Sequence, residues 1–152
     1  MGSACNCGQS PWQWSNISSY YHAAVNQKLF HGTLNPSGQP NCGTACGQCY
    51  QLSTSGTNVY NDGVGSGSTI TVQIVDACYS ANDHWCGGTS DDFKDSSSCG
   101  VHFDLMTGAP GTSGQAAVGA DGKVWNGGGQ IVYYTPVACP ESLSSQYQGC
   151  TC

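Results

Sequence analysis

Eleven cysteines in a chain of 152 residues constrain the fold more than any other feature of this sequence. They stand at positions 5, 7, 42, 46, 49, 78, 86, 99, 139, 150 and 152, and so reach both ends of the chain. A metal site is the alternative, because Cys42, Cys46 and Cys49 have the short spacings of zinc ligands. Zinc knuckles, however, usually pair two such clusters within a few dozen residues of a basic intracellular protein. We therefore predict a disulfide framework without a metal, and the odd number predicts one spare thiol.

The charge of the chain excludes several kinds of partner. The formal net charge is −6, only 8% of the residues are charged, and arginine is absent. Such a chain does not neutralise phosphates, so we expect neither nucleic acid nor a membrane as a partner. Low charge beside 22 glycines and eight tyrosines is typical of an extracellular protein that faces neutral, polar ligands such as sugars.

The ends of the chain and its length predict one secreted domain. We find no signal peptide and no apolar run that approaches a membrane span, as expected of a mature secreted chain. Residues 1–3 resemble a cloning remnant, and residues 4–152 are predicted to form a single domain.

The pattern of apolar residues predicts an all-β fold. Four short segments have the character of strands, at residues 49–54, 69–75, 101–106 and 130–137. Residues 18–30 place apolar side chains on one helical face, contain no Gly or Pro, and predict the single helix. Glycine-rich turns separate these segments. The combination predicts a β-barrel with one helix covering one side.

Two of the nine acidic residues stand where catalysis is plausible. Asp76 ends the alternating strand, and Asp104 lies inside the apolar strand at 101–106. Apolar surroundings disfavour the charged form of a carboxylate, which suits a general acid. The structural alternative is that Asp104 only accepts backbone hydrogen bonds at a strand end. Glu141, which follows Cys139-Pro140, is expected to be exposed.

The histidines and aromatic residues give weaker signals. The four histidines have no metal-ligand spacing, and His102 is more typical of a structural residue that shares its strand with Asp104. For any single aromatic residue, Tyr50 included, a place in the core is the better expectation. Trp85 and Trp125 lie in glycine-rich, polar segments, so they are the better candidates for stacking on sugar rings.

Five blocks of the sequence, in family order, resemble glycoside hydrolase family 45. They are Ala4-Cys5-Asn6-Cys7-Gly8, the run Cys-Gly-Thr-Ala-Cys-Gly-Gln-Cys-Tyr-Gln-Leu at 42–52, Asn82-Asp83-His84-Trp85-Cys86, His102-Phe103-Asp104 and Pro136-Val137-Ala138-Cys139-Pro140. Expansins and loosenins share the barrel and the His-Phe-Asp block, but all five blocks together favour the hydrolase branch. The resemblance implies a six-stranded double-psi β-barrel, secretion, and hydrolysis of internal β-1,4-glucosidic bonds with inversion.

The same resemblance implies roles for individual residues. Asp104 matches the family's catalytic acid, which protonates the departing glycosidic oxygen. An inverting enzyme also needs a base about 6.5–9.5 Å away, to leave room for the attacking water. Most of the family supplies an Asp just before the first Cys-x-Cys-Gly, where this sequence has four residues and none is acidic. One branch instead uses an Asn in its imidic tautomer. Asn82 matches that Asn, and Asp76 is the alternative carboxylate.

The resemblance also implies a set of bridges and of substrate contacts. The expected disulfides are Cys5–Cys46, Cys7–Cys150, Cys42–Cys152, Cys49–Cys139 and Cys78–Cys86, which leaves Cys99 as the spare thiol. The expected substrate-binding residues are Asp76, Trp85, Tyr50, His102 and Trp125.

We therefore predict a monomeric endo-β-1,4-glucanase, a cellulase without a cofactor. Its expected substrates are cellulose, cello-oligosaccharides and mixed-linkage glucan. A non-hydrolytic, wall-loosening protein similar to an expansin or loosenin is the main alternative, because the N-terminal Asp is missing. A barwin-like carbohydrate-binding protein without turnover is a third.

Overall fold

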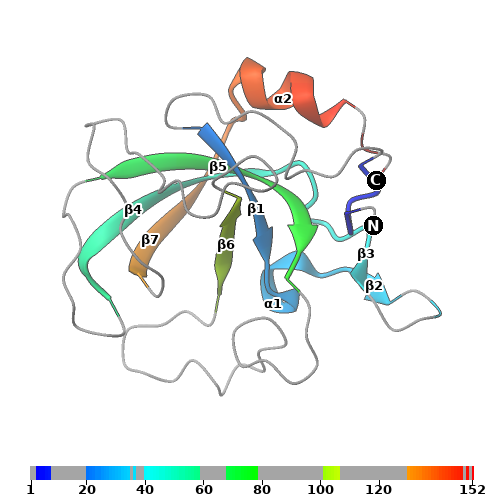
Figure 1. Cartoon of the computed structure of the whole chain (residues 1–152), viewed down its shortest axis with the longest axis horizontal. Helices are drawn as coiled ribbons and strands as arrows, with labels where there is room; N and C mark the ends of the chain where they lie inside the picture. Colours follow the sequence, from blue (N-terminus) through cyan, green and yellow to red (C-terminus); the bar gives the residue numbers. More distant parts are fainter. Residues whose placement is uncertain are drawn as a thin grey trace.

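The computed structural model describes residues 3–7, 20–34, 36, 40–58, 68–78, 101–106, 130–148, 150 and 152. Within these ranges strands dominate, and the predicted all-β class is confirmed (Figure 1). The elements, in chain order, are β1 (Tyr20–Val25), α1 (Gln27–Phe30), β2 (Thr33–Leu34), β3 (Pro40–Asn41), β4 (Cys49–Asn58), β5 (Thr69–Ala77), β6 (Phe103–Met106), β7 (Gln130–Val137) and α2 (Glu141–Tyr147).

The main sheet has five strands in the order β6-β1-β5-β4-β7. The β1–β5 pair is parallel, and the other neighbouring pairs are antiparallel. In a flat sheet, four steps of about 4.8 Å would separate the edge strands β6 and β7 by about 19 Å. The rings of Phe103 on β6 and Tyr134 on β7 nevertheless lie 5.6 Å apart. The sheet is therefore rolled.

Side chains, and not backbone hydrogen bonds, join the two edges of this rolled sheet. In the part of the chain that the structure describes, β6 and β7 share no ladder, and no sixth strand stands between them. Tyr50 on β4 completes the contact, with its ring 5.8 Å from Phe103 and 6.2 Å from Tyr134. The predicted barrel is thus present as a rolled five-stranded sheet whose two edges are joined by contacts between aromatic rings.

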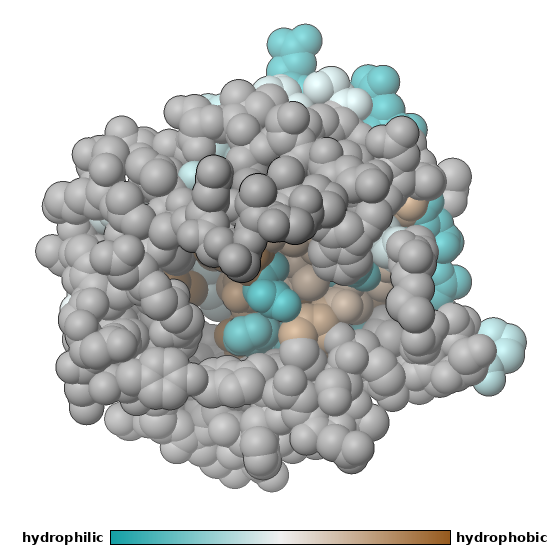
Figure 2. Space-filling model, in the orientation of Figure 1, coloured by the Kyte–Doolittle hydropathy of each residue, from teal (hydrophilic) through white to brown (hydrophobic). Residues whose placement is uncertain are grey.

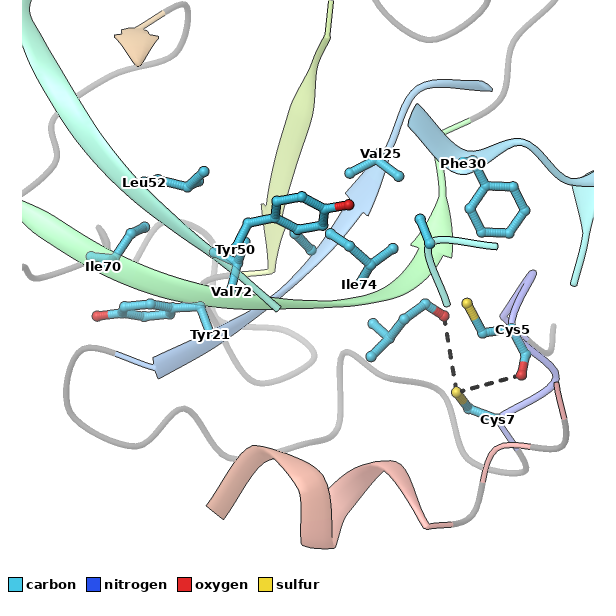
Figure 3. Packing of buried hydrophobic residues seen from close by; sticks show 13 residues of the cluster. Cys5, Cys7, Tyr21, Val25, Phe30, Tyr50, Leu52, Ile70, Val72 and Ile74 are labelled. Carbon is cyan, nitrogen blue, oxygen red and sulfur yellow. Dashed lines mark hydrogen bonds between the residues drawn. The ribbon is translucent and has the colours of Figure 1, made fainter. Parts of the chain in front are cut away.

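The register of the strands defines an inner and an outer face. Residues directly opposite one another on paired strands share a face, so every row can be read from the Cα partners. The inner rows supply the core, whose members are buried and apolar (Figure 3). They include Tyr21, Ala23, Val25, Tyr50, Leu52, Ile70, Val72 and Ile74.

The prediction of a helix over residues 18–30 is wrong for most of its length. Tyr20–Val25 is strand β1, and only Gln27–Phe30 is helical. The strand lies between β5 and β6 and is covered on both faces, so Tyr21 through Val25 are all buried. A strand buried on both faces has a continuous apolar run without period-two alternation, which is easily mistaken for a helical face.

Helix α2 was missed by the sequence reasoning. Its start carries a modest signal, since Pro140 precedes the helix and Glu141 is an acidic residue in its first turn. Leu143 is fully buried. Glu141 is exposed, which confirms the expectation for that residue. At the C-terminal end of α2 the Tyr147 ring packs against Gly47. A Cβ atom at position 47 would lie 2.7 Å from this ring, and the φ angle of Gly47 is 78°. Glycine is therefore required at this contact.

The four strand predictions are confirmed, three of them with longer or shorter bounds and one with the same bounds. Residues 49–54 lie within β4, 69–75 within β5, and 130–137 is β7. The segment 101–106 contains β6, which begins only at Phe103.

Four of the five expected disulfides are confirmed. They are Cys5–Cys46, Cys7–Cys150, Cys42–Cys152 and Cys49–Cys139. Cys78 is also disulfide-bonded, while Cys86 and Cys99 lie outside the described residues.

The bridges tie both chain ends to the segment before β4, and Figure 1 shows the two termini side by side. Cys7–Cys150 closes a loop of 143 residues, and such a closure contributes about 4–5 kcal/mol in the chain-entropy model. Cys42, Cys46 and Cys49 therefore serve as bridge partners of other segments and do not form a zinc cluster.

Candidate active site

Strand β6 carries Asp104 on the outer face of the sheet. Its neighbours Phe103 and Leu105 are partly buried and pack against the core, whereas the Asp104 side chain is exposed. This corrects the expectation of a carboxyl enclosed by apolar residues. The segment is apolar because Phe103 and Leu105 point toward the core, whereas Asp104 points to the other side, since successive side chains of a strand face opposite sides. An exposed carboxyl on this strand is accessible to a ligand from solvent.

The surface is hollowed close to this strand. Figure 2 shows a depression near the centre of the molecule, in which hydrophilic and hydrophobic described residues are visible. In the same orientation Figure 1 places β6 and β1 at the centre of the view.

Asp76 lies in the same row of the sheet as Asp104. Ala24 on β1 pairs with Asp104 on one side and with Asp76 on the other. Two strand spacings put the Cα atoms of the two aspartates roughly 10 Å apart, with the small residue Ala24 between them in the row. The fold therefore brings together the two carboxylates that the sequence singled out.

A β-bulge produces this alignment. The β1–β5 register shifts between Ala23 and Ala24, so that Ala23 pairs with Ile74 and Ala24 with Asp76. Val75 is the extra residue. Without it, Asp76 would stand opposite Val25 and point into the core, whereas the bulge turns it to the outer face. Bulges often re-aim a side chain next to a functional site.

The Asp76 carboxyl is engaged by backbone amides. Its Oδ1 accepts hydrogen bonds from the backbone N–H of Ala4 at 2.6 Å and of Ala77 at 2.9 Å. Burial raises the pKa of Asp76, and these two hydrogen bonds act in the opposite direction. The side chain is only 9% exposed, so its clearest role is to fasten the N-terminal segment to the end of β5.

His102 and Tyr50 make contacts that position β6. His102 is partly buried, and its carbonyl oxygen accepts the backbone N–H of Asn26 at 3.1 Å, which ties the start of β6 to the end of β1. Tyr50 is buried and donates its hydroxyl to Oε1 of Gln48 at 2.9 Å. Both residues hold the Phe103–Asp104 segment in place, and a direct contact with substrate stays a prediction for each.

The sequence reasoning missed a buried polar row beside the site. His22 on β1 pairs with Met106 on β6 and with Gln73 on β5. His22 is 1% exposed, and desolvation by burial lowers its pKa from 6.5 to about 4. The imidazole is therefore neutral at neutral pH. Its position in an apolar strand gave the only signal, namely a polar residue between buried neighbours.

Several predicted site residues lie outside the described residues. They are Asn82, Trp85 and Trp125. Within the described ranges no three His, Cys, Asp or Glu side chains gather as a metal site, and no helix there is long and apolar enough to cross a membrane.

Comparison with known proteins identifies the family of the chain and several similar proteins. A family described as EXPB1-like domain 1 matches residues 1–147. Endoglucanase-5 of Hypocrea jecorina is 31% identical over 160 residues, an alignment that takes in 98% of this chain. The chain spans 57% of the length of that relative.

Two solved structures are similar along nearly the whole chain. The family 45 endoglucanase EG27II, solved with cellobiose, superposes with a TM-score of 0.66 at 25% identity, over 97% of this chain and 80% of that one. The β-1,4-D-endoglucanase Cel45A from the blue mussel Mytilus edulis has a TM-score of 0.61 at 24% identity, over 97% and 83%. These matches confirm the resemblance to glycoside hydrolase family 45 that the sequence motifs indicated.

Proposed function

This chain belongs to the EXPB1-like domain 1 family, and from that premise we propose that it is an endoglucanase that hydrolyses internal β-1,4-glucosidic bonds. The likeness to Endoglucanase-5 and to EG27II supports the reaction class. Because function on a shared fold depends on the site, the observation that carries the proposal is local. Asp104 stands exposed on β6, at the end of the His-Phe-Asp block, and the surface is hollowed near the strand that carries it.

Asp104 is the general acid in this proposal. Its protonated carboxyl gives a proton to the glycosidic oxygen as the bond to the anomeric carbon breaks. A water molecule attacks that carbon from the opposite side of the ring, which inverts its configuration. The exposed position suits a polymer that approaches from solvent, and Phe103 and Leu105 hold the strand from the core side.

Asn82 is the proposed base or water-orienting residue, and Asp76 is the alternative. The row Asp104–Ala24–Asp76 has a spacing comparable with that of an inverting pair, which favours Asp76. The two backbone hydrogen bonds on Asp76 favour a structural role instead. We therefore assign the base to Asn82 and keep Asp76 as a residue that positions the N-terminal segment.

The proposed substrate is an uncharged β-1,4-glucan such as cellulose or a cello-oligosaccharide. EG27II binds cellobiose in its crystal structure, and this chain has the low charge that suits neutral sugars. The bridges that join both chain ends are typical of oxidising compartments, so we propose that the protein is secreted. We propose a monomer.

The test is reducing-end release from soluble cellulose derivatives by wild type and Asp104→Asn. We expect the variant to lose at least about a hundredfold in turnover, the usual contribution of a general acid, with an unchanged thermal midpoint. Asp104→Asn turnover within a few-fold of wild type would contradict the assignment. NMR of the first-formed anomer then tests inversion.

A non-hydrolytic, wall-loosening protein is the second candidate. The observation in its favour is that the nearest carboxylate in the Asp104 row, Asp76, is occupied by backbone amides. Weakening of filter paper without any release of reducing ends would establish this candidate in place of the hydrolase.

A further inference from the structure

The outer face of the sheet has a second region that neither the motifs nor the proposed reaction use. Its members are polar and uncharged, and they come from three adjacent strands. They are Thr69 and Thr71 on β5, Gln51 and Ser53 on β4, and Tyr133 and Thr135 on β7. We call this set the open face.

The register places these side chains in two parallel rows. Gln51 has Thr71 on one side and Thr135 on the other, and Ser53 has Thr69 and Tyr133. Three strands span about 10 Å, and the rows are about 7 Å apart along the strands, which is larger than a single pyranose ring. The first row continues to the partly exposed Tyr20 on β1.

Tyr133 is the most unusual member of the open face. Its side chain is 71% exposed. Among the residues that the structure describes, no other large hydrophobic side chain is exposed. The residue opposite it on β4 is the small Ser53, which leaves the ring uncovered on that side. An exposed tyrosine offers a rigid apolar ring with a polar tip, which suits the apolar face and the hydroxyls of a sugar.

The absence of charge on the open face favours one kind of ligand. Covering a charged side chain with a neutral polymer costs its hydration, whereas hydroxyl and amide groups exchange hydrogen bonds with water for hydrogen bonds with sugar hydroxyls at little cost. Acidic or basic macromolecules find no complementary charge here. The outer surface of a rolled sheet is convex, so it suits an extended polymer lying across it better than a small sugar that needs an enclosing pocket.

We propose that the open face is a second, non-catalytic binding site for the surface of insoluble β-1,4-glucan. The site rests on the proposed function for its choice of polymer. It would hold the protein on the substrate while the region around Asp104 acts, and Tyr133 would supply the main contact.

The experiment measures binding to insoluble cellulose by depletion, with Asp104→Asn as the parent so that hydrolysis does not change the polymer. In that parent, Tyr133→Ala is expected to raise the dissociation constant at least about fivefold, as for loss of an important interface contact. Gln51→Glu changes an amide to a carboxylate of the same shape and is expected to weaken binding by a similar factor. Ser144→Ala, at an exposed position of α2, is the matched control and is expected to bind like the parent.

Hydrolysis of a soluble cello-oligosaccharide by Tyr133→Ala, made in the wild-type chain, separates this proposal from the proposed function. We expect wild-type turnover on the oligosaccharide, because the open face does not touch the reacting bond. If the chain hydrolyses nothing, the proposed function fails while the binding measurement still decides on the open face. Thermal midpoints of all variants are expected to stay within a few degrees of the parent.

Unchanged cellulose binding by both Tyr133→Ala and Gln51→Glu would overturn the proposal. So would sedimentation that shows a wild-type dimer which Tyr133→Ala dissociates, because the face would then be an interface between two copies.

Discussion

The outer face of the sheet is polar along two neighbouring rows, yet the two rows have opposite environments. In one row His22 and Gln73 are 1% and 2% exposed, and in the next row Gln51 and Thr135 are exposed to solvent. The rows are two residues apart on the same strands. Strand geometry does not distinguish them, so their difference comes from what covers them.

Among the described residues, two segments that disulfides anchor lie against the strands of the first row. The Gln73 side chain donates from Nε2 to the carbonyl oxygen of Gly47 at 3.3 Å, and α2 packs on β1. Cys49–Cys139 anchors the chain just before α2, and Cys7–Cys150 anchors it just after. The comparison teaches that the covered row serves stability, whereas the open row is available to a ligand.

Removal of the Cys7–Cys150 bridge is expected to have the largest effect on this comparison. The double variant Cys7→Ser with Cys150→Ser should lose about 2–5 kcal/mol of unfolding free energy, because a native disulfide restricts the unfolded chain, whose ends Cys5–Cys46 and Cys42–Cys152 still link indirectly. Urea denaturation measures the change. A loss below about 1 kcal/mol would mean that the other bridges hold the cover by themselves.

The buried imidazole of His22 predicts a smaller, pH-dependent effect. The pKa of His22 is about 4 in the folded protein and near 6.5 in the unfolded chain. Between these pH values the imidazole is protonated in the unfolded chain and neutral in the folded protein. Its neutral form therefore supports folding above pH 6.5, and stability falls as the pH drops toward 4, by about 3 kcal/mol in total.

The variant His22→Gln isolates this effect. We expect it to remove most of the acid-linked loss of unfolding free energy, measured by urea denaturation at pH 7 and pH 4.5. His31→Gln is the matched control, because His31 is exposed, and it should keep the wild-type slope. Equal slopes for His22→Gln and wild type would refute the assignment of His22 as the titrating group.

The smallest effect is expected at Asp76. Asp76→Ala leaves the N–H groups of Ala4 and Ala77 without their acceptor and should cost about 1–3 kcal/mol of unfolding free energy. Asp76→Asn keeps an acceptor oxygen and should cost less. With Asn82 as the base, turnover of Asp76→Asn should stay within about tenfold of wild type. A fall of more than about a hundredfold would move the base to Asp76.

Local sequence patterns predicted the parts of the fold that depend on neighbouring residues. The alternation of Ile70, Val72 and Ile74 predicted β5, because one face of this strand lies against the core. For β1 the same reasoning failed, since coverage on both faces removes the alternation. Helix α2 was missed because its first turn carries little more than Pro140 and Glu141.

The candidate site was predictable only as a set of residue types. An acidic residue within an apolar strand marked Asp104, but its exposure follows from which face β6 turns outward. The alignment of Asp76 with Asp104 depends on the single extra residue Val75, and nothing in the local sequence marks a bulge there.

The sequence by itself determined the all-β class and the resemblance to family 45, because motifs are properties of the chain. That resemblance in turn implied the four bridges that the structure contains. Only the tertiary structure decided which polar residues are buried and which are open. Burial depends on what packs over a strand from distant parts of the chain. His22 and Gln51 are both polar residues of strands, yet His22 is buried and Gln51 is exposed.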